Sequence, residues 1–439
     1  RRLIMKSDGN IVEIRCLFMN QIQLNERVFN RRMALSGRSV GVALFCLYVF
    51  ISSLANDMVL SSSIGSLTLY LFLGYSVLYI LLNKKLKIDR MIKWMLVFIA
   101  FCVFTMLYSP EKDFLSNSEF YLLIVNFILI LFLSQYDINI NDIKKISWAN
   151  VLSGGVLIFI LFARGNLTGF STSNRFGEDL FGNSNILATL LMKTALYAIW
   201  LLVYSENKII HKIVLTLCLV ASYYGMFLSG GRKFIIIPAV FLYILLIFKR
   251  DSHGRKHLVK YTGVVVAIVI AGYYLIMNVP MFYAVIGERM ESLFSFIRTG
   301  HSISGKSAEI RATMIEIGFN RWLDSPIWGY GFDSFKHYNR LITGHFYYSH
   351  NNYIELLYDL GIIGFAIYYW FYWKLFYVAW KGKNNYAPEI RAFVIGIVFS
   401  MLVFEYGAVN YTETATQIML FFACTMLKEP RYERRHIDE

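Results

Sequence analysis

The sequence predicts an all-α protein that crosses a membrane many times. Of its 439 residues, 57% are hydrophobic and 16% are charged, whereas about 25% of residues are charged in a typical soluble domain. The apolar residues fall in runs of about 16 to 22, the length at which a helix crosses a bilayer. The basic residues gather in the short connections between the runs, as in multi-pass membrane proteins.

About twelve apolar runs are predicted to be transmembrane helices. With the N-terminus placed in the cytoplasm, the even-numbered connections hold most of the cations, which predicts that both termini are cytoplasmic. The net charge of +14 therefore reflects topology, and we expect no nucleic-acid partner. The predicted spans are 40–56, 63–82, 93–108, 120–134, 148–163, 185–204, 213–229, 233–248, 258–278, 356–380, 391–409 and 414–427.

The predicted organisation has five parts. Residues 1–39 form a polar, basic N-terminal segment, 40–278 contain nine spans, 279–350 form one large external loop, 351–427 contain three more spans, and 428–439 form the cytoplasmic tail. An ordered loop of this length is usually functional, so we expect the large loop to contribute to a site.

Helical spacing and turn residues predict order inside the large loop. Apolar residues between Lys306 and Leu323 recur at helical spacing and predict an amphipathic helix. Pro326 follows as a stop signal, and the sequence Gly329-Tyr330-Gly331 is typical of a turn.

Three clusters of chemically capable residues lie on the same, external side of the predicted topology. They are Ser173–Asn185, Ser229–Lys233 and His345–His350. The second is a tight Gly-Gly turn that places Arg232 at the membrane edge. A guanidinium there can bind two phosphate oxygens as a pair, so the turn indicates a phosphate site.

Each candidate also has a purely structural interpretation. Arg175 could be a solvated loop residue, Arg232 a snorkelling residue, and His350 a helix cap or a satisfied polar residue. Glu355 and Asp359 lie four residues apart on one helical face. For Glu355 we favour a structural partnership with an arginine of the large loop.

Two charges lie inside predicted spans. Lys193 is in the sixth span and Glu405 is near the end of the eleventh. Ionisable groups within a membrane normally have a partner and a function, but the sequence does not reveal the partners of these two.

The order of the motifs resembles a known family. His350-Asn351 is followed after nine residues by Gly361 and after two more by Gly364, which is similar to a signature of the O-antigen ligase and Wzy-type polysaccharide polymerase family. Upstream motifs between about residues 170 and 370 are similar to others of that family, although Ser184 stands where its Asn-Pro-Asn motif has proline. These motifs are Arg175 with Phe181–Asn185, Ser229–Arg232, Ser307–Arg311 and Ser325–Gly331.

The resemblance implies a GT-C-like membrane glycosyltransferase of the bacterial cytoplasmic membrane, with its active site on the external side. Such an enzyme transfers a glycan from undecaprenyl diphosphate to an acceptor hydroxyl, with inversion, and needs no metal or other cofactor. The implied partners are the lipid-linked oligosaccharide or polysaccharide, a glycan or lipid acceptor, membrane lipids and a chain-length regulator. By resemblance, His350 is the base, Arg175, Arg232 and Arg311 bind the diphosphate, and Asn351, Asp359 and Asn185 support them.

Several functions stay open at this point. A Wzy-type polymerase of O-antigen, capsule or exopolysaccharide units is favoured over a ligase that moves the finished chain to another acceptor. A transporter of lipid-linked glycan would also have many spans and internal charges, but it does not require a histidine beside external arginines. An intramembrane hydrolase is the other open class, and it is disfavoured because the sequence has no His-Glu-x-x-His.

Overall fold

The computed structural model describes residues 37–55, 59–110, 117–164, 175–248, 255–299 and 307–428. These residues form helices and connections, with no strand among them. The predictions about the N-terminal segment up to residue 36 and about the tail from residue 429 concern residues outside this part of the chain.

Helices cover all of the predicted spans. The helix Gly37–Ser52 and helices α2–α5, α7–α10 and α15–α17 each overlap one apolar run. The bounds are α2 Ser62–Asn83, α3 Arg90–Met106, α4 Ser118–Ser134, α5 Ile140–Ala163, α6 Glu178–Phe181, α7 Ser184–Tyr204, α8 Ile209–Leu228, α9 Arg232–Phe248, α10 Arg255–Asn278, α11 Pro280–Phe282, the π-helix η1 Tyr283–Gly287, α12 Glu288–Thr299, α13 Ser307–Trp322, α14 Phe335–Thr343, α15 Asn352–Lys381, α16 Pro388–Glu405 and α17 Thr414–Met426.

Five helices among the described residues are long and apolar enough to cross a membrane: α2, α5, α7, α8 and α15. A sixth candidate is a pair bent by 93°, Val269–Asn278 with Pro280–Thr299. The all-helical, multi-pass architecture is therefore confirmed. The number of twelve spans is not, because several of the other apolar helices are short, and the GT-C-like fold is not established either.

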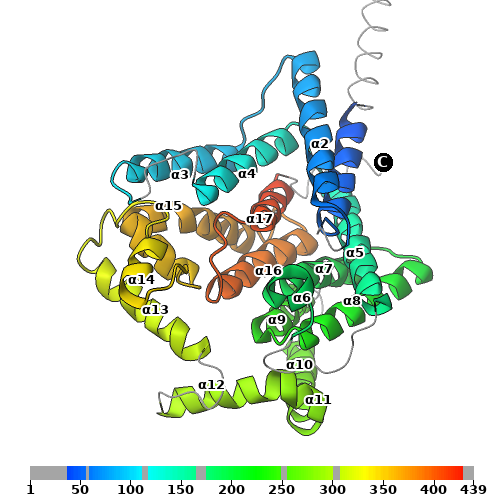
Figure 1. Cartoon of the computed structure of the whole chain (residues 1–439). Coiled ribbons are helices and arrows are strands. Elements are labelled where there is room, and N and C mark those ends of the chain that lie inside the picture. Colours follow the sequence, from blue (N-terminus) through cyan, green and yellow to red (C-terminus); the bar gives the residue numbers. More distant parts are fainter. Residues whose placement is uncertain are drawn as a thin grey trace, which may run out of the picture.

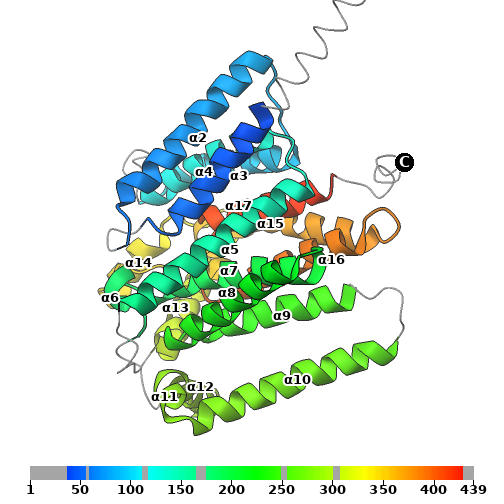
Figure 2. The same cartoon turned by 90° about the vertical axis from the view of Figure 1, so that its right-hand side faces the viewer.

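The long helices run roughly side by side, and the short helices gather at one end of them (Figure 2). Helix α7 packs against α5, α8 and α9, and α9 packs against α16. Helices α16 and α17 lie in the middle of the bundle (Figure 1). The side chain of Trp200 in α7 is fully buried. Helices α6 and α11–α14 therefore lie where residues far apart in sequence can meet.

Helix α15 is broken near its start, whereas the sequence predicts one continuous span over 356–380. Gly361 has φ 62° and ψ −170°, which is not helical. The turn after α13 fits into the break. The backbone N–H of Gly331 donates to the carbonyl of Asp359 (2.8 Å), and the N–H of Ile362 donates to the carbonyl of Pro326 (2.9 Å). These bonds attach the large loop to the membrane helix.

The predicted helix in the large loop is confirmed as α13. It ends at Trp322, four residues before Pro326. Its apolar residues do not form one buried face, because Met314 is buried whereas Ile310 and Phe319 are exposed. Met314 packs with Phe335 and Tyr358, so α13 connects α14 and α15.

Candidate active site

The centre of the candidate site is the turn between α8 and α9. Gly230 has a φ of +69°, a conformation that glycine adopts without steric cost. The backbone N–H of Phe176 donates to the carbonyl of Leu228 (3.1 Å), which holds Arg175 beside the turn. A Cβ added at Gly230 would lie 3.5 Å from Cδ of Arg175. The first two predicted clusters therefore meet at this turn, which ends at Arg232.

Arg289, in the first turn of α12, belongs to the same site and was not among the predicted site residues. Its Nη1 donates to the carbonyl of Gly230 (3.3 Å). The guanidinium of Arg232 donates in turn to the carbonyl of Arg289. Helix α12 follows a π-helix, and such segments occur frequently at functional sites. The sequence Gly287-Glu288-Arg289 alone gave no signal that would single out this arginine.

Arg311 in α13 adds a fourth guanidinium. It lies close enough to Arg232 and Arg289 for electrostatic repulsion. Burial lowers the pKa of Arg311, and the charge of Arg175 lowers it further. Within the described part of the chain, its guanidinium makes no hydrogen bond or ion pair. Such a buried cation is stabilised by a bound anion.

The four guanidinium groups concentrate positive charge, and Glu178 offsets part of it at Arg175 and Arg289. Nη2 of Arg175 forms an ion pair with Oε1 of Glu178 at 3.3 Å. Arg232 donates to the carbonyl of Arg289, and Arg289 donates to the carbonyl of Gly230. The cluster is therefore suited to a ligand with more than one negative charge, because each guanidinium can donate to anionic oxygens in pairs.

His350 lies at the junction of the large loop and α15, in a constrained backbone. Its φ is +56°, which is uncommon for a residue with a side chain. On one side, Ser349 is buried and its N–H donates to Oε2 of Glu355 (2.7 Å). On the other, Asn351 caps α15 by accepting from the N–H groups of Tyr353 and Ile354. The hydrogen bonds of Ser349 and Asn351 thus fix the backbone of His350 between them.

The imidazole of His350 lies within electrostatic range of Arg311 and Lys233. Burial lowers its pKa to about 4, and the charges of Arg311 and Lys233 contribute to the shift. The ring contacts Tyr348, with centroids 4.5 Å apart, and forms no hydrogen bond to any described residue. At neutral pH the imidazole is therefore uncharged and has a nitrogen lone pair available to accept a proton.

Lys233 belongs to the second predicted cluster, but the sequence assigned it no role of its own. Its Nζ donates to the carbonyl of Gly407 (2.6 Å) and lies 4.4 Å from the ring centroid of Phe404. It follows Arg232 directly in the chain, so the start of α9 supplies cations to both the arginine cluster and the surroundings of His350.

The two carboxylates of α15 hold the large loop in place. The oxygens of Asp359 accept from the backbone N–H groups of Asp333, Ser334 and Phe335 and from the hydroxyl of Ser334. The expectation that Glu355 pairs with an arginine is wrong: among the described residues its partner is the N–H of Ser349. A buried backbone donor needs an acceptor, and Glu355 supplies it.

The remaining predicted residues lie outside this cluster or inside the bundle. Asn185 is in the first turn of α7, and no hydrogen bond links it to the arginines among the described residues. The two intramembrane charges now have partners. Lys193 pairs with Glu413 at 2.9 Å, and the fully buried Glu405 accepts from the hydroxyls of three tyrosines, Tyr368, Tyr369 and Tyr372.

The fold and the site define a multi-pass membrane protein that has a cluster of arginines beside a histidine. Residues 214–369 match the family model described as O-Antigen ligase. The resemblance seen in the motifs is thereby confirmed over this part of the chain, which contains Arg232, Arg289, Arg311 and His350 but not Arg175. No curated protein matches the chain.

Proposed function

We propose that this protein is a membrane glycosyltransferase of the polymerase type. It would transfer a glycan from undecaprenyl diphosphate to a hydroxyl of a second lipid-linked glycan. The observation that carries the proposal is the convergence of four arginines from separate segments beside an uncharged imidazole. Arginines suit a diphosphate leaving group, and a neutral imidazole suits a general base.

In this reaction His350 accepts the proton of the acceptor hydroxyl as its oxygen attacks the anomeric carbon of the donor. The new C–O bond forms on the face opposite the departing diphosphate, so the anomeric configuration inverts. The bond between the anomeric carbon and the diphosphate oxygen breaks, and undecaprenyl diphosphate leaves with the electron pair. Arg175, Arg232, Arg289 and Arg311 stabilise the negative charge that develops on it.

The site also favours glycosyl transfer over hydrolysis and over transport of a lipid-linked glycan. The sequence contains one match to the Gly-x-Ser-x-Gly motif of serine hydrolases, at Gly37–Gly41. Ser39 lies within a helix there, whereas a nucleophile elbow needs a strand, a sharp turn and then a helix. A transporter of lipid-linked glycan has no need of an uncharged base beside the diphosphate.

A ligase is the second candidate, because the matching family model is described as O-Antigen ligase. A ligase would use the same arginines and the same base. It would differ in its acceptor, which would be a lipid or protein and not a second copy of the lipid-linked glycan.

The test uses the purified, reconstituted full-length protein and lipid-linked repeat units extracted from the source cells. A ladder of longer products supports the polymerase. A product that forms only when a second class of acceptor is added supports the ligase. If undecaprenyl diphosphate is released under neither condition, a transferase is ruled out.

His350→Ala tests the assignment of the base, with His345→Ala as its control. A positioned base contributes about a hundred- to ten-thousand-fold in rate, so His350→Ala should lose at least that lower factor while it remains folded. His345 is an exposed residue of the same loop, stacked on Tyr347, and its replacement should leave turnover nearly unchanged. A folded His350→Ala protein with more than about a tenth of wild-type turnover contradicts the assignment of the base.

A further inference from the structure

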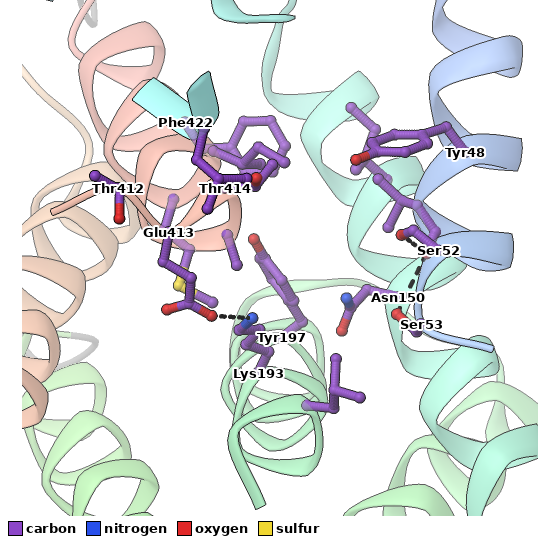
Figure 3. A pocket seen from close by; sticks show the side chains of 17 residues that line it. Tyr48, Ser52, Ser53, Asn150, Lys193, Tyr197, Thr412, Glu413, Thr414 and Phe422 are labelled. Carbon is purple, nitrogen blue, oxygen red and sulfur yellow. Dashed lines mark hydrogen bonds and ion pairs between the residues drawn. The ribbon is translucent and has the colours of Figure 1, made fainter. Parts of the chain in front are cut away.

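A cavity lies apart from the arginine cluster, between the helix Gly37–Ser52 and helices α4, α5, α7 and α17 (Figure 3). Its volume is about 320 Å³. This is at the lower end of the range of ligand pockets, about 300–1,000 Å³. Apolar side chains and the rings of Tyr48, Tyr197 and Phe422 form much of its lining.

One wall of the cavity is polar but has little net charge. Nζ of Lys193 and Oε1 of Glu413 form an ion pair of 2.9 Å across it. Asn150 also lines the cavity, and its buried Oδ1 has no hydrogen-bond partner among the described residues. A buried acceptor without a partner is costly, so a ligand or a water that donates to Asn150 would stabilise this wall.

The cavity is electrostatically connected to the candidate active site. Glu413 attracts the ammonium of Lys233 as well as that of Lys193. Lys233 in turn acts on His350. The connection between α16 and α17 joins the two places, because it contains both Glu413 and Gly407, whose carbonyl accepts from Lys233. The connection between α16 and α17 therefore links the cavity to the surroundings of the proposed base.

We propose that this cavity binds a sugar residue of the acceptor glycan; the proposal rests on the proposed transferase function. A sugar has apolar C–H faces that pack on aromatic rings, and hydroxyls that can both donate to Asn150 and Glu413 and accept from Lys193. An isoprenoid chain would leave these polar groups without new partners. A diphosphate would bind the arginine cluster in preference, because the Lys193–Glu413 pair offers it no net positive charge.

The test is protection of an introduced cysteine, which needs no turnover. Ser52 is exposed and lines the cavity, so Ser52→Cys places a thiol at its edge. Ser66→Cys, at an exposed position of α2 that does not line the cavity, is the matched control. Both are labelled with a maleimide in the purified full-length protein, and protein without either cysteine gives the background from the native thiols. The probes are the oligosaccharide freed from the lipid-linked donor by mild acid, and undecaprenol.

At ten times its Kd the oligosaccharide should slow labelling of Ser52→Cys about tenfold, because the unliganded fraction falls in that proportion. Ser66→Cys should be unaffected, and Asn150→Leu should remove the protection. Protection by undecaprenol alone identifies a lipid site and overturns the proposal. Protection by neither probe, or protection that survives Asn150→Leu unchanged, overturns it as well.

The same experiment separates this proposal from the proposed function. In the double variant Ser52→Cys with His350→Ala, protection should persist although transfer is lost. If the Ser52→Cys protein transfers glycan but the oligosaccharide does not protect its cysteine, the sugar site is disproved and the transferase is not. Protection without transfer would disprove the transferase and leave a glycan-binding protein.

Discussion

The backbone N–H of Ser349 donates a 2.7 Å hydrogen bond to Oε2 of Glu355, so a carboxylate in the first turn of α15 fixes the residue before His350. Glu355→Leu removes the acceptor and leaves the N–H buried, which costs about 1–3 kcal/mol. Glu355→Gln retains an acceptor oxygen. We expect the leucine variant to have a lower melting temperature and turnover, and the glutamine variant to retain most of both. Equal losses in the two variants would show that the hydrogen bond from Ser349 is not what Glu355 contributes.

The arginine cluster predicts which variants lose affinity for undecaprenyl diphosphate and which do not. Replacing Arg232, Arg289 or Arg311 with alanine removes hydrogen bonds to a charged group, each worth about 1.5–3 kcal/mol, or about ten- to a hundredfold in affinity. Arg321 lies on the same helix as Arg311 but pairs with Asp324 at 2.7 Å, so Arg321→Ala is the control and should change little.

The measurement is the equilibrium binding of undecaprenyl diphosphate to each purified variant. Arg232→Lys should restore little of the loss, since an ammonium cannot make the paired contact. If Arg289→Ala binds undecaprenyl diphosphate with normal affinity, Arg289 is not part of the diphosphate site.

The environment of His350 predicts an unusual pH profile. Burial, with the charges of Arg311 and Lys233, lowers the pKa of the free imidazole to about 4. The base form is therefore present above that pH, and kcat/KM should stay level through neutral pH and fall only as the pH drops through about 4. A bound diphosphate offsets the charge of Arg311, so the acid limb of kcat should lie at a higher pH. A limb of kcat/KM near the ordinary histidine value of about 6.5 would contradict this environment.

The break in α15 predicts that Gly361 cannot be replaced. A Cβ at this position would lie 2.2 Å from the carbonyl oxygen of Ile327, and the backbone has φ +62°. We expect Gly361→Ala to lower stability by about 1–3 kcal/mol, measured as the melting temperature in detergent. Gly74→Ala is the control, because nothing lies within 4 Å of its added Cβ. A Gly361→Ala protein as stable as the control would mean that α15 is not broken in this way.

The predicted sidedness can be tested with two exposed positions. Thr343, at the end of α14, is predicted to be external, and Asn141, at the start of α5, to be cytoplasmic. A cysteine at position 343 should react with an impermeant thiol reagent added to intact cells, whereas one at position 141 should not. The opposite pattern would place the arginine cluster on the cytoplasmic side and exclude an external reaction. Ser171 is likewise predicted to be external and Ser252 to be cytoplasmic, but both lie outside the described residues.

The sequence by itself determined the all-helical, multi-pass fold class and supplied most of the candidate site residues as predictions. Runs of apolar residues and the helix and turn signals around Pro326 are local, and each local signal predicted a helix or turn that the structure contains. Arg232 was selected from local context, because a tight Gly-Gly turn between two apolar runs places it at the predicted membrane edge, whereas Arg311 was selected only through the family resemblance. The number of spans did not follow, since an apolar run of 16 or 17 residues occurs both in spanning helices and in shorter ones.

Only the tertiary structure decided which charges meet. Lys193 and Glu413 are 220 residues apart, and Arg289 joins the cluster because a π-helix and α12 place it against Gly230. Likewise, α15 breaks at Gly361 because the turn after α13 donates hydrogen bonds to its carbonyls. The sequence shows which residues are polar or charged. It does not show which groups they contact, because packing decides which distant segment lies next to each charge or backbone carbonyl. The partner of each group therefore depends on the whole fold.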